Sequence, residues 1–369
     1  MILSFNQKSI LLATVIAFSG YGIANAQSNT KEVVINFEGW VGSDRFACGE
    51  SYDRVGASET TITPNDFRFY VSDVALIDED GNAVPVELKQ DGKWQYQNTT
   101  LLDFEDGTGA CDNGTTDTNT TIVGTLPEGD YQSLQFTLGV PKNLNHDDAA
   151  IAPSPLNLTS MWWNWQGGYK FLRADLETDG AISNVSSQTT HSQGGHSDMQ
   201  VNQQHTSTHS QGGSHTTVQT NSQTGIFKNG QGTHSQTSTT THHQGMDHGN
   251  MNHGDMNHGK EGMDMSSNSY LIHLGSTGCK ESSKSELFGC VNPNRATITL
   301  SDFDVDDNVV VADLAELLYD TDLSSNQANT ATGCMSSPED GDCASRIQRL
   351  GLSFNGTTSS EGQKFFFVE

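Results

Sequence analysis

The sequence predicts a mainly β fold: an antiparallel β-sandwich stapled by disulfides, with one or two short helices and a long insert that lacks core-forming residues. Apolar and polar residues alternate in five segments, at 33–37, 67–71, 134–140, 270–274 and 298–300. Clusters of Gly, Asn and Asp separate these segments, as expected of turns between half-buried strands. The alternation therefore predicts two sheets that each bury one face.

One helix is expected near the C-terminal end. Leu314, Leu317 and Leu318 have the spacing of one helical face, which predicts a helix over 311–319.

The N-terminus has the pattern of a secretory signal peptide. Lys8 precedes a short apolar run at 10–20, and Ala24-Asn25-Ala26 supplies a cleavage site before Gln27. Residues 1–26 are therefore predicted to be removed, and the protein is predicted to be periplasmic, secreted or on the cell surface of a Gram-negative bacterium. No later segment has 18 consecutive apolar residues, so no membrane insertion is expected.

The chain is strongly acidic, with a formal net charge of -27. Loss of Lys8 with the signal peptide would change that value from -27 to -28. Such a chain repels nucleic acids and anionic membranes and attracts cations. Nucleic acid is therefore excluded as a partner, although the charge also has a simple role in solubility.

The even number of cysteines indicates disulfides. All six lie in the exported part, where an oxidising compartment favours three bridges. Six cysteines allow about 15 pairings, and the sequence does not choose among them. Nearness in sequence favours Cys279–Cys290 and Cys334–Cys343, which leaves Cys48–Cys111.

Composition divides the mature chain into three parts. Residues 27–181 and 269–369 have the composition of a folded domain and are assigned to the two parts of one β-sandwich. Residues 182–268 consist mostly of small polar residues, His and Met, with few apolar residues and no periodicity. This stretch cannot build a core and is predicted to be a disordered insert between two strands.

The insert carries most of the potential metal ligands. Eleven of the 13 His residues and six of the nine Met residues lie between 191 and 265. A five-residue repeat, M-[DN]-H-G-x, occurs in three copies, with ligands Met246, His248, Met251, His253, Met256 and His258.

Thioether sulfur favours Cu(I), and imidazole binds both copper oxidation states. The repeat therefore predicts copper binding. Other divalent metals and a metal-free low-complexity spacer are the alternatives. Acidic segments at 102–107 and 302–307 could give oxygen ligands to calcium, although solvated turns explain them more simply.

Two histidines and three neighbouring tryptophans lie outside the insert. The histidines are His146 and His273, and the tryptophans are Trp162, Trp163 and Trp165. A single histidine is more often a structural residue than a ligand, but three tryptophans in four residues indicate a core or a binding face.

Several segments together resemble the MbnP family, the four-Cys member of a two-protein metal system. They are 46–49, 66–72, 139–146, 155–157, 161–171, 273–279 and 292–296. The resemblance implies a periplasmic or surface β-sandwich with a mononuclear copper site formed by histidines near a tryptophan. It also implies that a dihaem, cytochrome c peroxidase-like partner of the MbnH type oxidises this tryptophan to kynurenine.

The positions that match are His146 and His273, with Trp162, Trp163 or Trp165 as the modified residue. The insert is a departure from the compact family pattern and suggests a larger copper load. Whether copper is acquired or detoxified is left open.

An enzyme is not expected, since the sequence lacks the hydrolase, zinc-protease and phosphate-binding motifs. The alternative to copper handling is a carbohydrate-binding or adhesin-like sandwich whose tryptophans stack on sugars.

Overall fold

The computed structural model describes residues 29–185, 268–282 and 286–369. The predicted signal peptide lies outside these residues. So do the three repeats of the insert, with the proposed ligands Met246, His248, Met251, His253, Met256 and His258.

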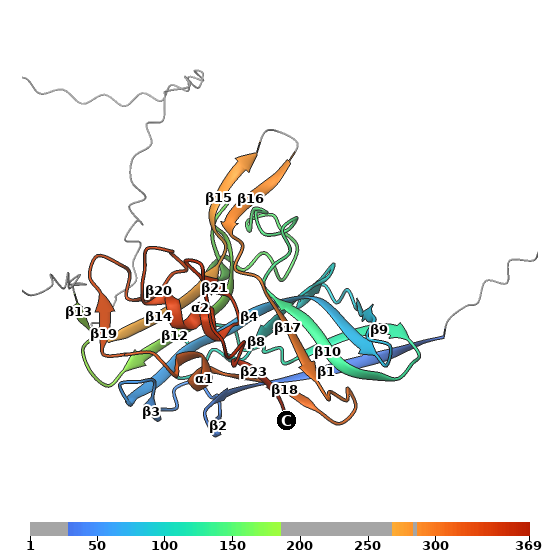
Figure 1. Cartoon of the computed structure of the whole chain (residues 1–369), viewed down its shortest axis with the longest axis horizontal. Helices are drawn as coiled ribbons and strands as arrows, with labels where there is room; N and C mark the ends of the chain where they lie inside the picture. The colour runs from blue at the N-terminus through green and yellow to red at the C-terminus, as the bar shows by residue number, and fades with distance from the viewer. Residues whose placement is uncertain (1–28, 186–267, 283–285) are drawn as a thin grey trace, which may run out of the picture. The chain divides into compact units, whose positions relative to one another are not determined.

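Two sheets form the body of the described chain (Figure 1). In the first sheet the strand order is β23-β18-β1-β9-β6, and β2 pairs with β1. Its strands are β1 (Thr30–Val41), β2 (Asp44–Arg45), β6 (Glu87–Leu88), β9 (Thr121–Pro127), β18 (Val309–Asp313) and β23 (Phe366–Val368).

The second sheet is larger and has the order β17-β10-β4-β12-β14-β20. The strands on this path are β4 (Thr60–Asp78), β10 (Tyr131–Leu138), β12 (Gly168–Thr178), β14 (Ser269–Gly275), β17 (Ala296–Ser301) and β20 (Gly333–Cys334). Shorter strands extend it: β3 (Tyr52–Val55), β5 (Ala83–Pro85), β7 (Gln95–Tyr96), β8 (Thr99–Asp103) and β11 (Trp162–Asn164). Three separate two-strand ladders join β13 (Ser183–Val185) to β19 (Ser325–Gln327), β15 (Thr277–Ser282) to β16 (Glu286–Asn292), and β21 (Ser353–Phe354) to β22 (Thr357–Thr358).

The main core combines side chains from both sheets, as a sandwich requires. Ile35 and Phe37 of β1 pack in it with Phe69 of β4 and Phe136 of β10. The five expected strand segments are confirmed in β1, β4, β10, β14 and β17, except that β10 ends at Leu138, two residues before the end of the segment 134–140. Most strand pairs are antiparallel, as predicted, but β1–β18, β14–β20 and β13–β19 are parallel. Each parallel pair joins strands that are distant in sequence, and such pairs cannot be closed by a tight hairpin.

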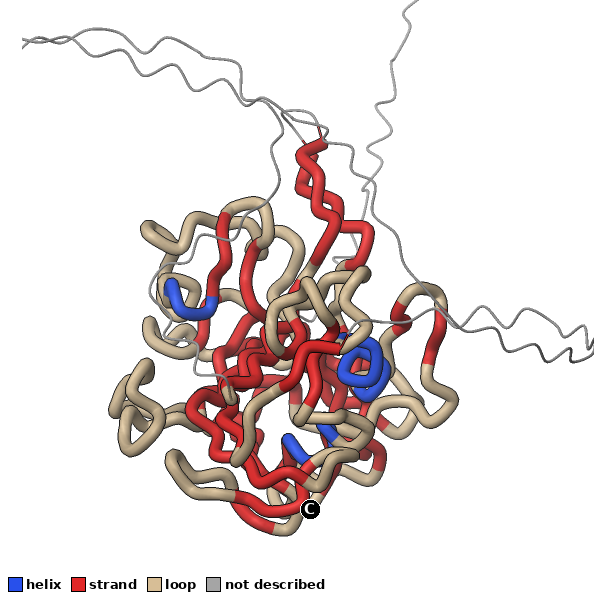
Figure 2. The backbone as a smooth tube through the Cα atoms, turned by 90° about the vertical axis from the view of Figure 1, so that its left-hand side faces the viewer, coloured by secondary structure: helices blue, strands red, loops and turns tan. Residues whose placement is uncertain are grey.

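Helices are short and few in the described part of the chain (Figure 2). They are α1 (Leu314–Leu318), α2 (Cys343–Arg349) and the 3-10 turn η1 (Thr159–Met161). The predicted start of a helix at 311 was wrong, because the β-branched residues that precede α1 belong to β18. The helix begins only at Leu314, where the Asp313 carboxylate caps it by accepting a hydrogen bond from the Ala315 amide. None of these helices is long and apolar enough to cross a membrane.

The three disulfides include the two that nearness in sequence favoured, Cys279–Cys290 and Cys334–Cys343, and the one that remained by elimination, Cys48–Cys111. They confirm the prediction of a stapled fold. The strands that flank the insert, β12 and β14, pair directly with each other, with Glu177 opposite Ser269. The short strand β13 falls just inside the stretch assigned to the insert.

The second sheet buries both of its faces near its centre, which the sequence did not predict. The alternation predicted that the face with Arg68, Tyr70 and Ser72 would be partly exposed to solvent, yet all three residues are buried. A second apolar cluster, which includes Tyr70, Tyr169 and Phe171, covers this face. The chain between β10 and β12, which supplies part of this cluster, also carries His146 and the three tryptophans.

Candidate functional site

His146 is held in a loop that follows β10. The loop is a compact turn in which the Leu144 and Asn145 amides both donate to the Pro141 carbonyl at 2.9 Å. Leu144 is buried in the second apolar cluster and anchors the turn. His146 therefore projects from a fixed backbone, although its side chain is part-exposed.

The tryptophans form a hairpin that docks against this loop. Asn164 caps the turn after β11 by accepting hydrogen bonds from the Gln166 and Gly167 amides. Gly168, at φ 77°, then brings β12 so close to the loop that a Cβ would lie 2.5 Å from the Asn145 carbonyl oxygen. Only glycine tolerates both this conformation and this approach.

The three tryptophans have different environments. Trp165 is 55% exposed, and its carbonyl oxygen lies 3.1 Å from His146 Nδ1. The Trp163 ring lies over Gly275, where a Cβ would be 2.7 Å from Trp163 Cζ3. Trp162 is half-buried, and its Nε1 has no hydrogen-bond partner within the described chain. Trp165 is thus the one most open to a partner molecule.

A disulfide completes the surroundings of His146. His146 Nε2 lies 3.6 Å from Cys290 Sγ. Within the described ranges, His146, Cys279 and Cys290 form a group whose potential ligand atoms all lie within 4.8 Å of one another. Sequence reasoning placed these cysteines only in a disulfide, because more than a hundred residues separate them from His146.

The surroundings of His146 favour a neutral ring whose acceptor nitrogen is Nε2. Burial lowers the pKa of its imidazole, opposed by the Trp165 carbonyl and by Asp147. A neutral ring that donates from Nδ1 to the Trp165 carbonyl carries its lone pair on Nε2. This is the arrangement in which metal-bound histidines are commonly oriented.

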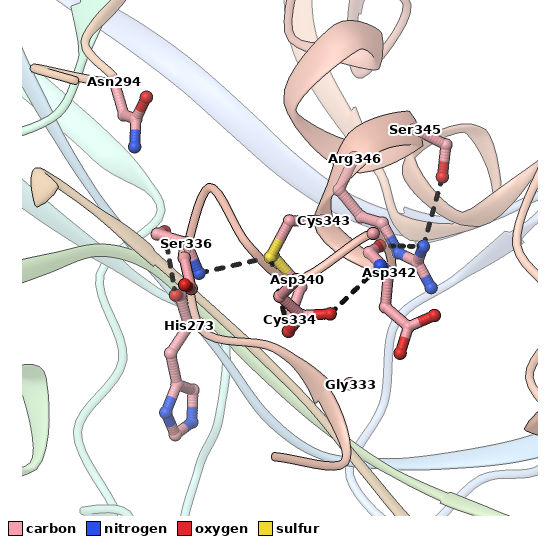
Figure 3. Close-up of a disulfide and its surroundings, with 12 residues drawn as sticks. His273, Asn294, Gly333, Cys334, Ser336, Asp340, Asp342, Cys343, Ser345 and Arg346 are labelled. Atoms are coloured by element: carbon pink, nitrogen blue, oxygen red, sulfur yellow. Dashed lines mark hydrogen bonds between the residues drawn. A yellow bond between two sulfur atoms is a disulfide. The ribbon is translucent and has the colours of Figure 1, made fainter. Parts of the chain in front are cut away.

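His273 lies in a different setting, on the buried outer face of the second sheet. Its Nε2 is 2.7 Å from Asp175 Oδ1, and the side chain is 3% exposed. Its carbonyl accepts from Ser336 Oγ at 3.2 Å, which ties β14 to the Cys334–Cys343 disulfide (Figure 3). The imidazole points away from that disulfide (Figure 3).

Asp175 belongs to a buried ionic network that spans β4, β12 and β14. Arg173 Nε lies 3.0 Å from Asp66 Oδ2, and the Arg173 guanidinium also binds Asp175. Arg68 pairs with Asp66 and Glu105. Arg68, Arg173 and His273 are neighbours in one row across the three strands.

One pattern in the sequence corresponds to this network: charged residues alternate with apolar ones in both β4 and β12. That pattern is more typical of a solvated face, so it did not indicate burial.

Charge and burial set the protonation of the network. Burial raises the pKa of Asp103 to about 8 and lowers the pKa of Lys170 to about 8. Burial alone would raise the pKa of Asp175, but His273 and Arg173 lower it. The pKa of His273 is lowered by burial and by the cations Lys170 and Arg173, although Asp175 opposes the shift.

These shifts predict a pH dependence of stability that resides in Asp103. The folded protein keeps its proton up to about pH 8, whereas the unfolded chain loses it near 3.8. The Asp103 contribution to the free energy of unfolding should therefore fall as pH rises between these values, by up to about 1.4 kcal/mol per pH unit.

Asp103→Asn should remove this slope, because an amide side chain does not titrate. The amide oxygen can still accept the hydrogen bond from the Glu105 backbone amide. Denaturant unfolding of both proteins at pH 5 and pH 8 measures the effect. An equal change in the two proteins would contradict the assignment.

The two predicted histidines can be compared as ligands for a soft or borderline cation. Each ring has one nitrogen directed at an oxygen, which leaves the other nitrogen to act as the ligand. Burial and the cations Lys170 and Arg173 disfavour a further positive charge at His273, although Asp175 opposes this effect. His146, which is part-exposed, is therefore the better-suited ligand.

The acidic segments considered for calcium are engaged within the described chain. Glu105 pairs with Arg68, and Asp106 accepts hydrogen bonds from Thr108. Asp304 accepts from the Asp306 amide in a tight turn. These contacts occupy oxygens that a calcium ion would need, so they favour the interpretation as turns.

Comparison with known proteins places the chain in a family. A family model described as MbnP matches residues 30–226, which is more than half of the chain. Among solved structures, MbnP from Methylosinus trichosporium has the same fold, with a TM-score of 0.62 and 23% sequence identity over 92% of this chain and 98% of that one. No curated protein sequence matches. Because the family model covers more than half of the chain and the fold agrees with it, the chain belongs to the MbnP family.

Proposed function

We propose that this protein is an exported copper-binding protein, in which the insert holds several copper ions and the folded body holds one more tightly. The observation that carries the proposal is the threefold M-[DN]-H-G-x repeat, which places thioether and imidazole ligands side by side. Many ligands repeated along one segment favour the number of ions bound over the affinity for each. A preformed site in the body favours a single ion.

The tight site is proposed at His146, with His273 as the second predicted ligand. The neutral His146 ring with its lone pair on Nε2 supports the first assignment. A site with few nitrogen ligands suits Cu(I), which accepts low coordination numbers.

Deletion of 246–265 should remove most of the Cu(I) capacity of the purified protein, measured as copper per chain after anaerobic loading and desalting. That segment contains three His and five Met residues. Deletion of 201–220 is the matched control, because it removes the same length and also three His residues but no Met. Capacity that is unchanged by the first deletion would refute the assignment, and an equal loss in both would show that the Met residues are dispensable.

His146→Ala should weaken the affinity for the most tightly bound Cu(I) ion about 10–100-fold. Loss of a residue that only supports a metal ligand already has an effect of this size. Competition with a coloured Cu(I) chelator, carried out in the insert-deleted protein, reports this directly. His273→Ala tests the second ligand, with circular dichroism to verify that the sheet remains folded. If either variant keeps the wild-type affinity, the two-histidine site is wrong.

The tryptophan hairpin is proposed as the site of oxidation to kynurenine by a dihaem partner. Trp165 is the candidate that solvent and partner reach most easily, and its backbone contacts His146. With peroxide as the oxidant, two peroxides convert the indole to N-formylkynurenine and two waters, and hydrolysis then releases formate. Peptide mass spectrometry of native protein would locate the change among Trp162, Trp163 and Trp165.

A further inference from the structure

The Cys279–Cys290 disulfide closes the base of a hairpin that extends beyond the rest of the folded body. Figures 1 and 2 both show the hairpin β15–β16 projecting outward. The two cysteines are direct partners across the ladder, with Cα atoms 3.8 Å apart. Ser276 Oγ donates to the Pro293 carbonyl and Asn292 donates to Thr277 Oγ1, so the base of the hairpin is fixed by contacts other than the disulfide.

The acceptor nitrogen of His146 lies beside this disulfide. Nδ1 is directed at the Trp165 carbonyl. Asn145 Oδ1 accepts from the Tyr169 amide at 3.1 Å, which turns the Asn145 NH₂ group toward His146 Nε2 at 3.4 Å. Two independent contacts thus define Nε2 as the acceptor nitrogen, and this nitrogen is the one 3.6 Å from Cys290 Sγ.

The spacing matches that of ligands around one ion. With metal–sulfur and metal–nitrogen bonds of about 2.3 and 2.0 Å, a nitrogen and a sulfur on one tetrahedral ion lie roughly 3.5 Å apart. The observed separation of 3.6 Å between Nε2 and Sγ needs almost no adjustment. Once the disulfide is opened, rotation about the cysteine side chains can bring the second sulfur to a similar distance.

We propose that reduction of the Cys279–Cys290 disulfide creates a metal site of two thiolates and the His146 imidazole, for a soft d¹⁰ cation such as Cu(I) or Zn(II). The reductant is a dithiol: two electrons and two protons pass to the cysteines, the S–S bond breaks, and the dithiol becomes a disulfide. Metal binding then displaces the two thiol protons, and Nε2 supplies the third ligand. In the oxidised form the sulfurs are bonded to each other and are poor ligands, so the site is gated by redox state.

Accessibility favours this disulfide over the other two. Cys290 is partly exposed and Cys279 is 8% exposed, whereas Cys334 and Cys343 are both fully buried. In the third bridge Cys111 is fully buried and only Cys48 is partly exposed. Thiol–disulfide exchange needs direct approach of a thiolate to sulfur, so the outward hairpin should react first.

This site shares the His146 imidazole with the proposed tight copper site, but the experiment that tests it detects coordination by the cysteine sulfurs. Neither the insert nor a two-histidine site contains a thiolate. The failure of one proposal is therefore distinguishable from the failure of the other.

The test uses Co(II) as the probe, because thiolate coordination gives an intense near-ultraviolet charge-transfer band. The full-length mature protein is treated anaerobically with limiting dithiol, desalted, assayed for free thiols and titrated with Co(II). The band should appear in the reduced protein with two thiols per chain and about one ion bound. It should be absent from the oxidised protein and persist when 246–265 is deleted.

Two variants locate the ligands. Cys279→Ser/Cys290→Ser, treated with the same dithiol, should lose the band. His146→Ala should keep the two reducible thiols but bind Co(II) about tenfold or more weakly. The proposal is overturned if reduced wild type with two free thiols gives no band, if the band survives in the double serine variant, or if His146→Ala leaves the affinity unchanged. The comparison of oxidised with reduced wild type decides the matter even if a variant folds poorly.

Discussion

Arg173→Met is expected to lower the free energy of unfolding by about 3–5 kcal/mol, the range typical of removing one partner from a buried ion pair. Arg173 is 3% exposed and lies between two carboxylates, Asp66 and Asp175. Methionine fills a similar volume but leaves both carboxylates short of a positive charge in a site that excludes water. Most of the expected decrease in the free energy of unfolding comes from the carboxylates that lose their partner, and less of it comes from the lost packing.

A surface ion pair supplies the control. Arg45 pairs with Glu38 at 2.8 Å, but its side chain is 74% exposed. Arg45→Met should change stability by less than about 1 kcal/mol, because water screens the pair and solvates either partner alone. Denaturant unfolding followed by circular dichroism compares the two variants with wild type. Similar small losses in both would mean that Asp66 and Asp175 satisfy their charge through Arg68 and His273.

Replacing Cys48 and Cys111 by serine is expected to lower stability by about 4 kcal/mol, because this bridge closes the longest loop of the three. The two cysteines are 63 residues apart in sequence, against 11 for Cys279–Cys290. A longer loop gains more conformational entropy in the unfolded chain when its cross-link is removed.

The matched variant is Cys279→Ser/Cys290→Ser, whose loss should be smaller by about 1.5 kcal/mol on loop length alone. Both double variants remove one bridge and add two hydroxyl groups. Unfolding midpoints measured under non-reducing conditions test the order. An equal or reversed order would show that contacts in the native state, and not the entropy of the unfolded chain, determine the contribution of each bridge.

Much of the fold could be predicted from the sequence because it depends on local patterns. Alternation in segments such as 33–37 and 270–274 predicted strands, since side chains in a strand point to opposite faces with a period of two. Nearness in sequence predicted two of the disulfides, and the third followed by elimination. The helix at Leu314 was expected, but its first turn was misplaced because the capping role of Asp313 depends on where β18 ends.

By itself, the sequence determined the strand-rich fold, the two short-range disulfides and the soft-ligand repeat, since each is encoded in residues close together along the chain. Only the tertiary structure decided that Arg68, Arg173 and Asp175 are buried, and that His146 lies beside Cys290. Both features join segments that are distant in sequence. Polar alternation looks the same whether water or a second apolar layer covers it, so only the packing of the loops over the sheet distinguishes the two.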